Sequence, residues 1–132
     1  MALKAPVLLL HSSGMSSRQW GRLIEILEPE HRIVAPDLLG SGANPLWPDD
    51  QPFDLAMDVD AIERIVDVVG EPVHVVGHSY GGLLAVTLAR RIPERILSLV
   101  VYDPVAFGVL HSENDAEGLA DLARAGNNPT FT

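Results

Sequence analysis

One short segment combines a candidate nucleophile with two glycines at the spacing that serine catalysis favours. Gly77, Ser79 and Gly81 form the pattern G-x-S-x-G between an apolar segment and a helix-like segment. Such a serine is expected at a sharp strand-to-helix turn, with a positive φ. Glycine suits the positions two before and two after it, because a β-carbon would crowd the turn. The pattern indicates a nucleophilic serine; the alternative is a glycine-rich turn that contains a serine by chance.

A second polar segment could help to bind the oxyanion that such a serine creates. His11-Ser12-Ser13-Gly14 follows an apolar run and precedes a helix-like segment. A tetrahedral acyl intermediate needs at least two N–H donors for its negative oxygen. We expect one donor to be the backbone N–H of Tyr80, directly after the serine, and this loop to supply the other. The alternative is an ordinary strand-to-helix turn in which a serine caps the helix.

Candidates for the acid and the base lie further along the chain. Asp103 follows the last apolar run and is either an acid that orients the base or a residue that shapes a turn before Pro104. A base must reach the serine hydroxyl and have a partner that orients it. Of the five histidines, His111 is the one on the correct side with freedom to move. The other four belong to the first loop, to strands, or to the position beside the serine: His11, His31, His74 and His78.

The elements that must position these residues alternate between strands and helices. Apolar runs predict strands at residues 6–10, 32–35, 73–76 and 96–102. Apolar stripes at helical spacing predict helices near residues 20–27, 62–69 and 80–91. A loop rich in Gly, Pro, Asn and Asp is expected at 38–52. Strands separated by helix-length segments imply right-handed crossovers and a parallel sheet, which is an α/β fold.

Composition limits the classes of protein and partner. The 132 residues fit one domain, 47% are hydrophobic, and the formal net charge is −9. We expect a core at residues 1–110, followed at 111–132 by the start of a lid or a surface helix. The only cluster of basic residues is Arg90-Arg91, so nucleic acid is not an expected partner. No apolar run has the length of a membrane span.

Cysteine usage and the N-terminus bear on chemistry and compartment. The chain has no cysteine, which excludes disulfides, thiol catalysis and thiolate metal sites. The first residues continue directly into folded-domain periodicity, so we expect no signal peptide and a cytoplasmic location. We expect neither a cofactor nor a metal ion.

Four segments resemble the α/β-hydrolase superfamily over about residues 6–104: PVLLLHSSGMSSRQW, HRIVAPDLLGSGANP, PVHVVGHSYGGLLA and PERILSLVVYDP. The resemblance implies a truncated form of that three-layer fold, with about four parallel strands in the spatial order second, first, third, fourth. By this resemblance, His11 matches the histidine of the oxyanion motif, Ser13 its backbone donor and Ser79 the nucleophile. Ser12 stands where the family usually has glycine, and Asp37 matches a position that shapes the loop after the second strand.

The resemblance also implies a function. Ser79 distinguishes the chain from relatives with an aspartate nucleophile, such as haloalkane dehalogenases and epoxide hydrolases. The expectation is a serine hydrolase of the esterase or lipase type, acting on a small ester or similar acyl substrate. In the family the acid and the histidine usually follow later strands, so we expect this chain to be the N-terminal part of a longer enzyme. The alternative is a catalytically silent fragment or interaction module that folds only with a partner segment. In either case residues 97–102 are expected at an open sheet edge, where the chain could self-associate.

Overall fold

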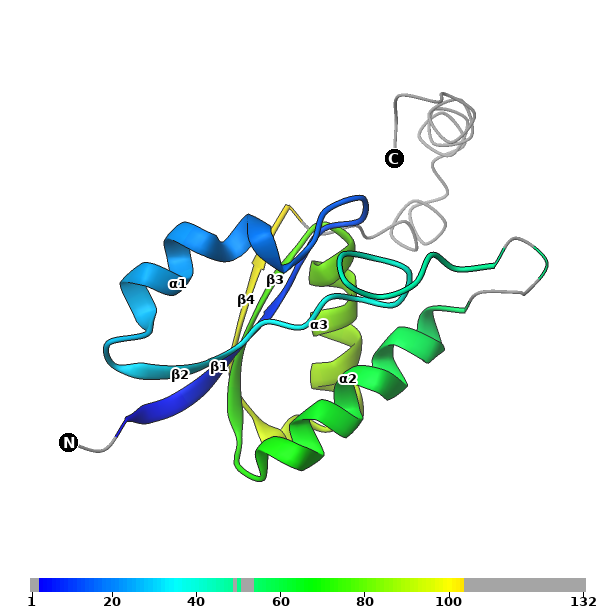
Figure 1. Cartoon of the computed structure of the whole chain (residues 1–132). Helices are drawn as coiled ribbons and strands as arrows, with labels where there is room; N and C mark the ends of the chain where they lie inside the picture. The colour runs from blue at the N-terminus through cyan, green and yellow to red at the C-terminus, as the bar shows by residue number, and fades with distance from the viewer. Residues whose placement is uncertain (1–2, 49, 51–53, 104–132) are drawn as a thin grey trace.

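The computed structural model describes residues 3–48, 50 and 54–103 of the chain. Four parallel strands form one sheet in the order β2-β1-β3-β4. They are β1 (Lys4–Leu10), β2 (His31–Val34), β3 (Val73–His78) and β4 (Ile96–Tyr102). Helix α1 (Gly21–Leu27) lies on one side of the sheet, while α2 (Leu55–Val69) and α3 (Tyr80–Arg91) lie on the other (Figure 1). The predicted α/β class, strand order and three layers are therefore confirmed.

Strand β1 is apolar along its length because both of its faces are covered. Val7 and Leu9 pack with Trp20 and the apolar side of α1. Leu8 and Leu10 point the other way and pack with α2 and α3. Leu9 and Leu10 have no exposed surface at all. A strand buried on both faces gives a continuous apolar run instead of an alternating one.

Helices on the two faces begin and end at recognisable signals. A short 3-10 helix, η1 (Ser17–Trp20), leads into α1, and the Ser16 hydroxyl accepts a hydrogen bond from the Arg18 N–H. Helix α2 begins well before its apolar stripe, because the Asp54 carboxylate accepts a bond from the Ala56 N–H and caps the helix. Gly70 ends α2 with a φ of 78°. A second short 3-10 helix, η2 (Pro93–Arg95), connects α3 to β4.

The carboxyl ends of the strands meet at one edge of the sheet. Leu10 at the end of β1 pairs in register with Gly77 of β3. Gly77 in turn pairs with Val101 of β4, and His78 pairs with Tyr102. Loops that leave these strand ends are therefore side by side, although the sequence separates them widely. In open α/β sheets this edge is where ligands usually bind.

Strand β4 differs from the other strands in its exposure. It is the last strand in the sheet order, and among the described residues no strand pairs with its outer edge. Leu97 and Val100 are each more than half exposed, and Tyr102 is 66% exposed. The predicted position of residues 97–102 at the sheet edge is thus confirmed within this part of the chain.

No helix in the described part is both long and apolar enough to cross a membrane.

Candidate active site

Ser79 occupies the turn between β3 and α3 in the conformation that its sequence pattern predicts. Its φ is 55° and its ψ is −115°, a region that non-glycine residues rarely adopt. Its N–H donates to the Tyr102 carbonyl of β4 at 3.0 Å. Its own carbonyl accepts from the N–H groups of Gly82 and Leu83. The backbone is therefore bonded on both sides, whereas the side chain makes no capping bond to the helix.

The two glycines of the pattern are required by close backbone contacts. A β-carbon at Gly77 would lie 2.3 Å from the Gly81 carbonyl oxygen. A β-carbon at Gly81 would lie 2.1 Å from the Leu10 carbonyl oxygen and 2.5 Å from that of His11. Real β-carbons do not come so close to backbone atoms, and backbone atoms cannot move aside as the end of a flexible side chain can. The first turn of α3 therefore packs directly against the end of β1.

The same contact places the 11–14 loop beside the start of α3. A turn follows β1, in which the Met15 N–H donates to the Ser12 carbonyl at 3.1 Å and Gly14 has a φ of 77°. Ser13 is exposed at the tip of this turn. The N–H of Tyr80 lies at the N-terminus of α3, where a helix leaves its N–H groups without partners inside the helix. Convergence of the Ser13 and Tyr80 N–H groups on one point near Ser79 stays a prediction.

His11 is a structural residue of this loop. It has no exposed surface, and its Nδ1 lies 2.8 Å from the Ser12 carbonyl oxygen. Its Nε2 accepts a hydrogen bond from the Leu38 N–H at 2.9 Å. Because Nε2 accepts, the proton of the neutral ring is on Nδ1, where it is donated to Ser12. Both ring nitrogens are thereby occupied, and His11 links the 11–14 loop to the loop that follows β2.

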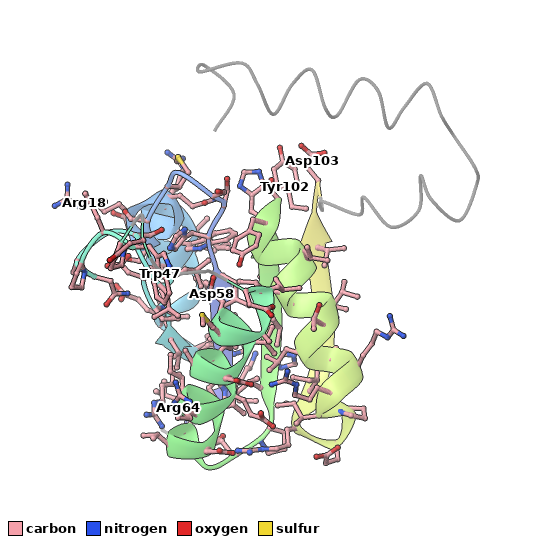
Figure 2. All side chains as sticks on the ribbon, turned by 90° about the vertical axis from the view of Figure 1, so that its right-hand side faces the viewer. Arg18, Trp47, Asp58, Arg64, Tyr102 and Asp103 are labelled. Atoms are coloured by element: carbon pink, nitrogen blue, oxygen red, sulfur yellow. The ribbon has the colours of Figure 1, made fainter. Side chains whose placement is uncertain are left out.

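The side chain of Tyr80 bonds to Asp58, a residue that the sequence analysis did not single out. Its hydroxyl donates to Asp58 Oδ2 at 2.7 Å, and Asp58 Oδ1 accepts from the Leu39 N–H at 3.0 Å. Asp58 is 1% exposed and lies near the start of α2 (Figure 2). Burial, and then the bond to Asp58, raises the pKa of Tyr80 well above its usual range. A signal was available: Asp58 falls in phase with the buried Ile62 and Val66, where an isolated carboxylate needs a partner.

Asp37 links the start of η1 to the loop that follows β2. Its carboxylate accepts hydrogen bonds from the Ala43 N–H at 3.0 Å and the Ser17 N–H at 2.8 Å. These bonds lower the pKa of Asp37 from 3.8 to about 2, because they stabilise the charged form. Gly42 is in contact with the carboxylate, and a β-carbon there would lie 2.3 Å from Asp37 Cγ. Asp37 thus shapes the loop after β2, as the resemblance implied.

Gln19 of η1 joins the 11–14 loop to the strand end that carries the serine. Its Oε1 accepts from the Ser12 N–H at 2.8 Å. Its Nε2 lies 2.7 Å from Nδ1 of His78, the residue before Ser79. On its other side the His78 ring packs against Tyr102, with ring centroids 4.9 Å apart. The sequence contained no signal for this bridge, because it depends on how η1 packs against β3.

The remaining candidates are placed as follows. Asp103 lies exposed at the end of β4, beyond Tyr102 and on the same sheet edge as Ser79 (Figure 2). Its φ is 48°, and no described residue bonds to its carboxylate. The role predicted for it as an acid stays a prediction. His111, with the rest of 111–132, lies outside the described residues.

Each of the four described histidines has a hydrogen-bond partner other than Ser79. His31 bonds to the Ala5 carbonyl and His74 to the Ser98 hydroxyl. His78 bonds to Gln19, and His11 has both nitrogens occupied. In the described part of the chain, no three metal-ligating side chains come together. A cavity of about 710 Å³ lies between β2 and α2, and Ser79 is not among the residues that line it.

Comparisons with known proteins match most of the chain to one family. The sequence profile of the alpha/beta hydrolase fold matches residues 5–132. Lipase LipV of Mycobacterium tuberculosis is 43% identical over 101 residues, which cover 76% of this chain and 37% of the lipase. The pimeloyl-[acyl-carrier protein] methyl ester esterase of Neisseria meningitidis is 34% identical over 115 residues, covering 86% of this chain and 42% of the esterase.

A solved structure shows the same arrangement of elements. The meta-cleavage product hydrolase CumD of Pseudomonas fluorescens superimposes with a TM-score of 0.66 and 32% identity, covering 75% of this chain and 38% of CumD. The chain thus spans well under half the length of the curated relatives it matches.

Proposed function

The chain belongs to the alpha/beta hydrolase family, and on this basis we propose that it provides the nucleophilic part of a serine hydrolase acting on an ester or similar acyl compound. The observation that supports this most directly is the conformation of Ser79, at a φ of 55° between two glycines that admit no β-carbon. Such a turn presents the serine hydroxyl at the edge of the sheet, clear of the strand. The names of the lipase and the methyl ester esterase agree with this class of substrate.

The proposed reaction follows from the groups around Ser79. Its Oγ attacks the acyl carbonyl carbon and gives its proton to a base, which forms a tetrahedral intermediate. The N–H groups of Tyr80 and Ser13 bind the negative oxygen of that intermediate. The bond to the leaving alcohol then breaks, the alcohol takes a proton, and an acyl group remains on Ser79. Water attacks this acyl group, releases the acid and restores the serine.

The base is the part that the described residues do not supply. All four described histidines are bonded elsewhere, as shown above. Within the chain the candidate base is His111, with Asp103 as the candidate acid that orients it. We favour a second source, a segment of a longer protein, because the chain spans only 37% of the lipase and 42% of the esterase.

An esterase assay on the purified chain tests the nucleophile. We expect slow release of p-nitrophenol from p-nitrophenyl acetate, because Ser79 attacks this activated ester without a described base to take its proton. Ser79→Ala should lower the rate to the residual level that the oxyanion hole and binding alone retain. Ser41→Ala, in the loop after β2, should leave it unchanged. An equal rate in Ser79→Ala would disprove the assignment of the nucleophile.

A second variant distinguishes between the two candidate sources of the base, His111 and a segment of a longer protein. If His111 is the base, His111→Ala should lower the rate as far as Ser79→Ala does. If the base comes from another segment, His111→Ala should match the parent chain. A parent chain with no Ser79-dependent rate would favour the alternative, a catalytically silent interaction module.

A further inference from the structure

Among the described side chains, only that of Gln19 bonds both to the residue before Ser13 and to the residue before Ser79. Its carbonyl oxygen accepts from the N–H of Ser12, which directly precedes Ser13. Its amide nitrogen lies 2.7 Å from the ring of His78, which directly precedes Ser79. One amide group therefore connects the loop proposed to bind the oxyanion with the turn that carries the nucleophile.

The direction of both bonds is fixed by chemistry. The backbone N–H of Ser12 can only donate, so the Gln19 atom that faces it must be the carbonyl oxygen. The amide nitrogen is then the atom that faces His78, and it too can only donate. Nδ1 of His78 must therefore carry a lone pair, which places the proton of the neutral ring on Nε2. The bridge thus selects one tautomer of His78.

His78 has a second side-chain contact, with Tyr102. Its ring packs against the ring of Tyr102 at a centroid distance of 4.9 Å. The carbonyl of Tyr102 accepts the N–H of Ser79 at 3.0 Å. Movement of His78 toward or away from Gln19 would therefore also disturb the backbone at Ser79. The same movement would act on Ser12 through the Gln19 carbonyl.

We propose that Gln19 is a positioning residue that sets the distance between the Ser13 N–H and Ser79. The proposal rests on the proposed function, since it assigns a role within the same oxyanion site. Gln19 touches neither the substrate nor the reacting atoms; it acts through Ser12 and His78. Such spacing matters because an error of about 1 Å in a reacting geometry can cost roughly 10²-fold in rate.

Nitrogen NMR of the 132-residue chain tests the bridge without any need for turnover. In the parent chain we expect the His78 ring in the Nε2–H form and slow hydrogen exchange of the Ser12 amide. Gln19→Met keeps the length of the side chain but removes both bonds, so the Ser12 amide should exchange roughly tenfold faster. Gln19→Glu can accept from both partners, so it should restore Ser12 protection and move the His78 proton to Nδ1.

The kinetic test uses the Ser79-dependent release of p-nitrophenol. Gln19→Met should lower kcat by about tenfold with little change in KM, because the oxyanion forms only after binding. In combination with His78→Ala the two losses should not add, because both variants remove the same bridge. Arg18→Met is the matched control: its side chain is exposed on the same 3-10 helix and bonds to no described residue.

The outcomes separate this proposal from the function on which it rests. A Ser12 amide and a His78 tautomer unaffected by Gln19→Met would overturn the bridge, whatever the activity. A confirmed bridge with unchanged kcat in Gln19→Met would overturn the positioning role. Absence of any Ser79-dependent rate in the parent chain would instead refute the proposed function and, with it, the catalytic meaning of the bridge.

Discussion

Ser79 has a strained backbone conformation, and contacts with its neighbours hold it in that conformation. A non-glycine residue in a sparsely populated region costs about 1–3 kcal/mol. Here the N–H and the carbonyl of Ser79 are both bonded, and two neighbouring positions have no side chain to obstruct the turn. Strain of this kind persists where the surrounding structure holds it, and it is concentrated at functional sites. The turn is therefore a property of the surrounding fold as well as of the serine.

The glycines of the turn should tolerate no substitution. In Gly77→Ala and Gly81→Ala the new methyl group would meet backbone carbonyls at 2.3 and 2.1 Å. We expect each to lower the free energy of unfolding by about 3 kcal/mol, the upper end of the usual cost of overpacking. Urea titration measures the loss as a lower midpoint.

Gly21→Ala is the control for this experiment. It lies at the start of α1, and outside its chain neighbours and its own helix backbone no atom lies within 4 Å of the added methyl group. Alanine there should be neutral or should stabilise the chain by up to about 1 kcal/mol, because it lowers the entropy of the unfolded chain. Equal midpoints for Gly81→Ala and Gly21→Ala would contradict the packing of α3 against β1.

The residues of the site differ in how far the sequence could reveal them. Ser79, Gly77 and Gly81 are recognisable because their spacing is local, and a local turn needs only local information. Gln19 and Asp58 bond to segments far away in the chain, so local spacing does not predict which residues they contact. The position of Asp58 in the helical period of α2 does indicate that it is buried, whereas nothing in the sequence distinguishes Gln19. Local geometry was thus predictable, and the network that supports it was not.

At the level of elements, the apolar periods predicted the type of each strand and α-helix in the described residues, whereas the spatial order of the strands came from the family resemblance. The boundaries that differed were set by polar contacts. β1 extends back to Lys4, whose N–H bonds to the Glu30 carbonyl, and β3 continues to His78 at the turn. The predicted stripe covered only the C-terminal part of α2, because the buried Asp58 and Val59 precede it and the start of the helix depends on Asp54. Periodicity reports which residues are buried, and caps and turns decide where an element ends.

The contact between α2 and α3 should depend on the Tyr80 hydroxyl. Tyr80→Phe removes the donor to Asp58 Oδ2 and leaves a buried carboxylate oxygen without that bond. An unsatisfied buried group costs about 1–3 kcal/mol, so we expect the free energy of unfolding to fall by that amount. Tyr102→Phe makes the same chemical change at a side chain that is 66% exposed. It should change stability by less than about 0.5 kcal/mol.

Thermal or urea unfolding of both variants gives the comparison directly. A Tyr80→Phe variant as stable as Tyr102→Phe would show that the bond to Asp58 makes no net contribution. If the predicted loss is found, Asp58→Asn in the Tyr80→Phe background should cost less than it does alone, because the two residues share one contact.

At the scale of the whole molecule, β4 is unusual because it is exposed but carries no charged side chain. The chain carries a formal net charge of −9, yet the seven residues of β4, ILSLVVY, carry no charge. Edge strands are usually protected by charged side chains, proline or a bulge in the strand. Within the described residues, β4 has an unpaired edge and exposed apolar side chains on both faces. These properties favour pairing with another chain.

We therefore expect the purified 132-residue chain to self-associate through β4 as its concentration rises. Val100 is 55% exposed near the middle of this strand, and Val100→Lys places a charge where a second strand would pack. Light scattering after size-exclusion chromatography should show a larger mass for the parent chain and a monomer for Val100→Lys. Val68→Lys is the matched control, because Val68 is 85% exposed on α2, away from β4. Self-association unaffected by Val100→Lys, or abolished equally by Val68→Lys, would exclude β4 as the interface, and a parent chain that stays monomeric would show that its open edge is protected.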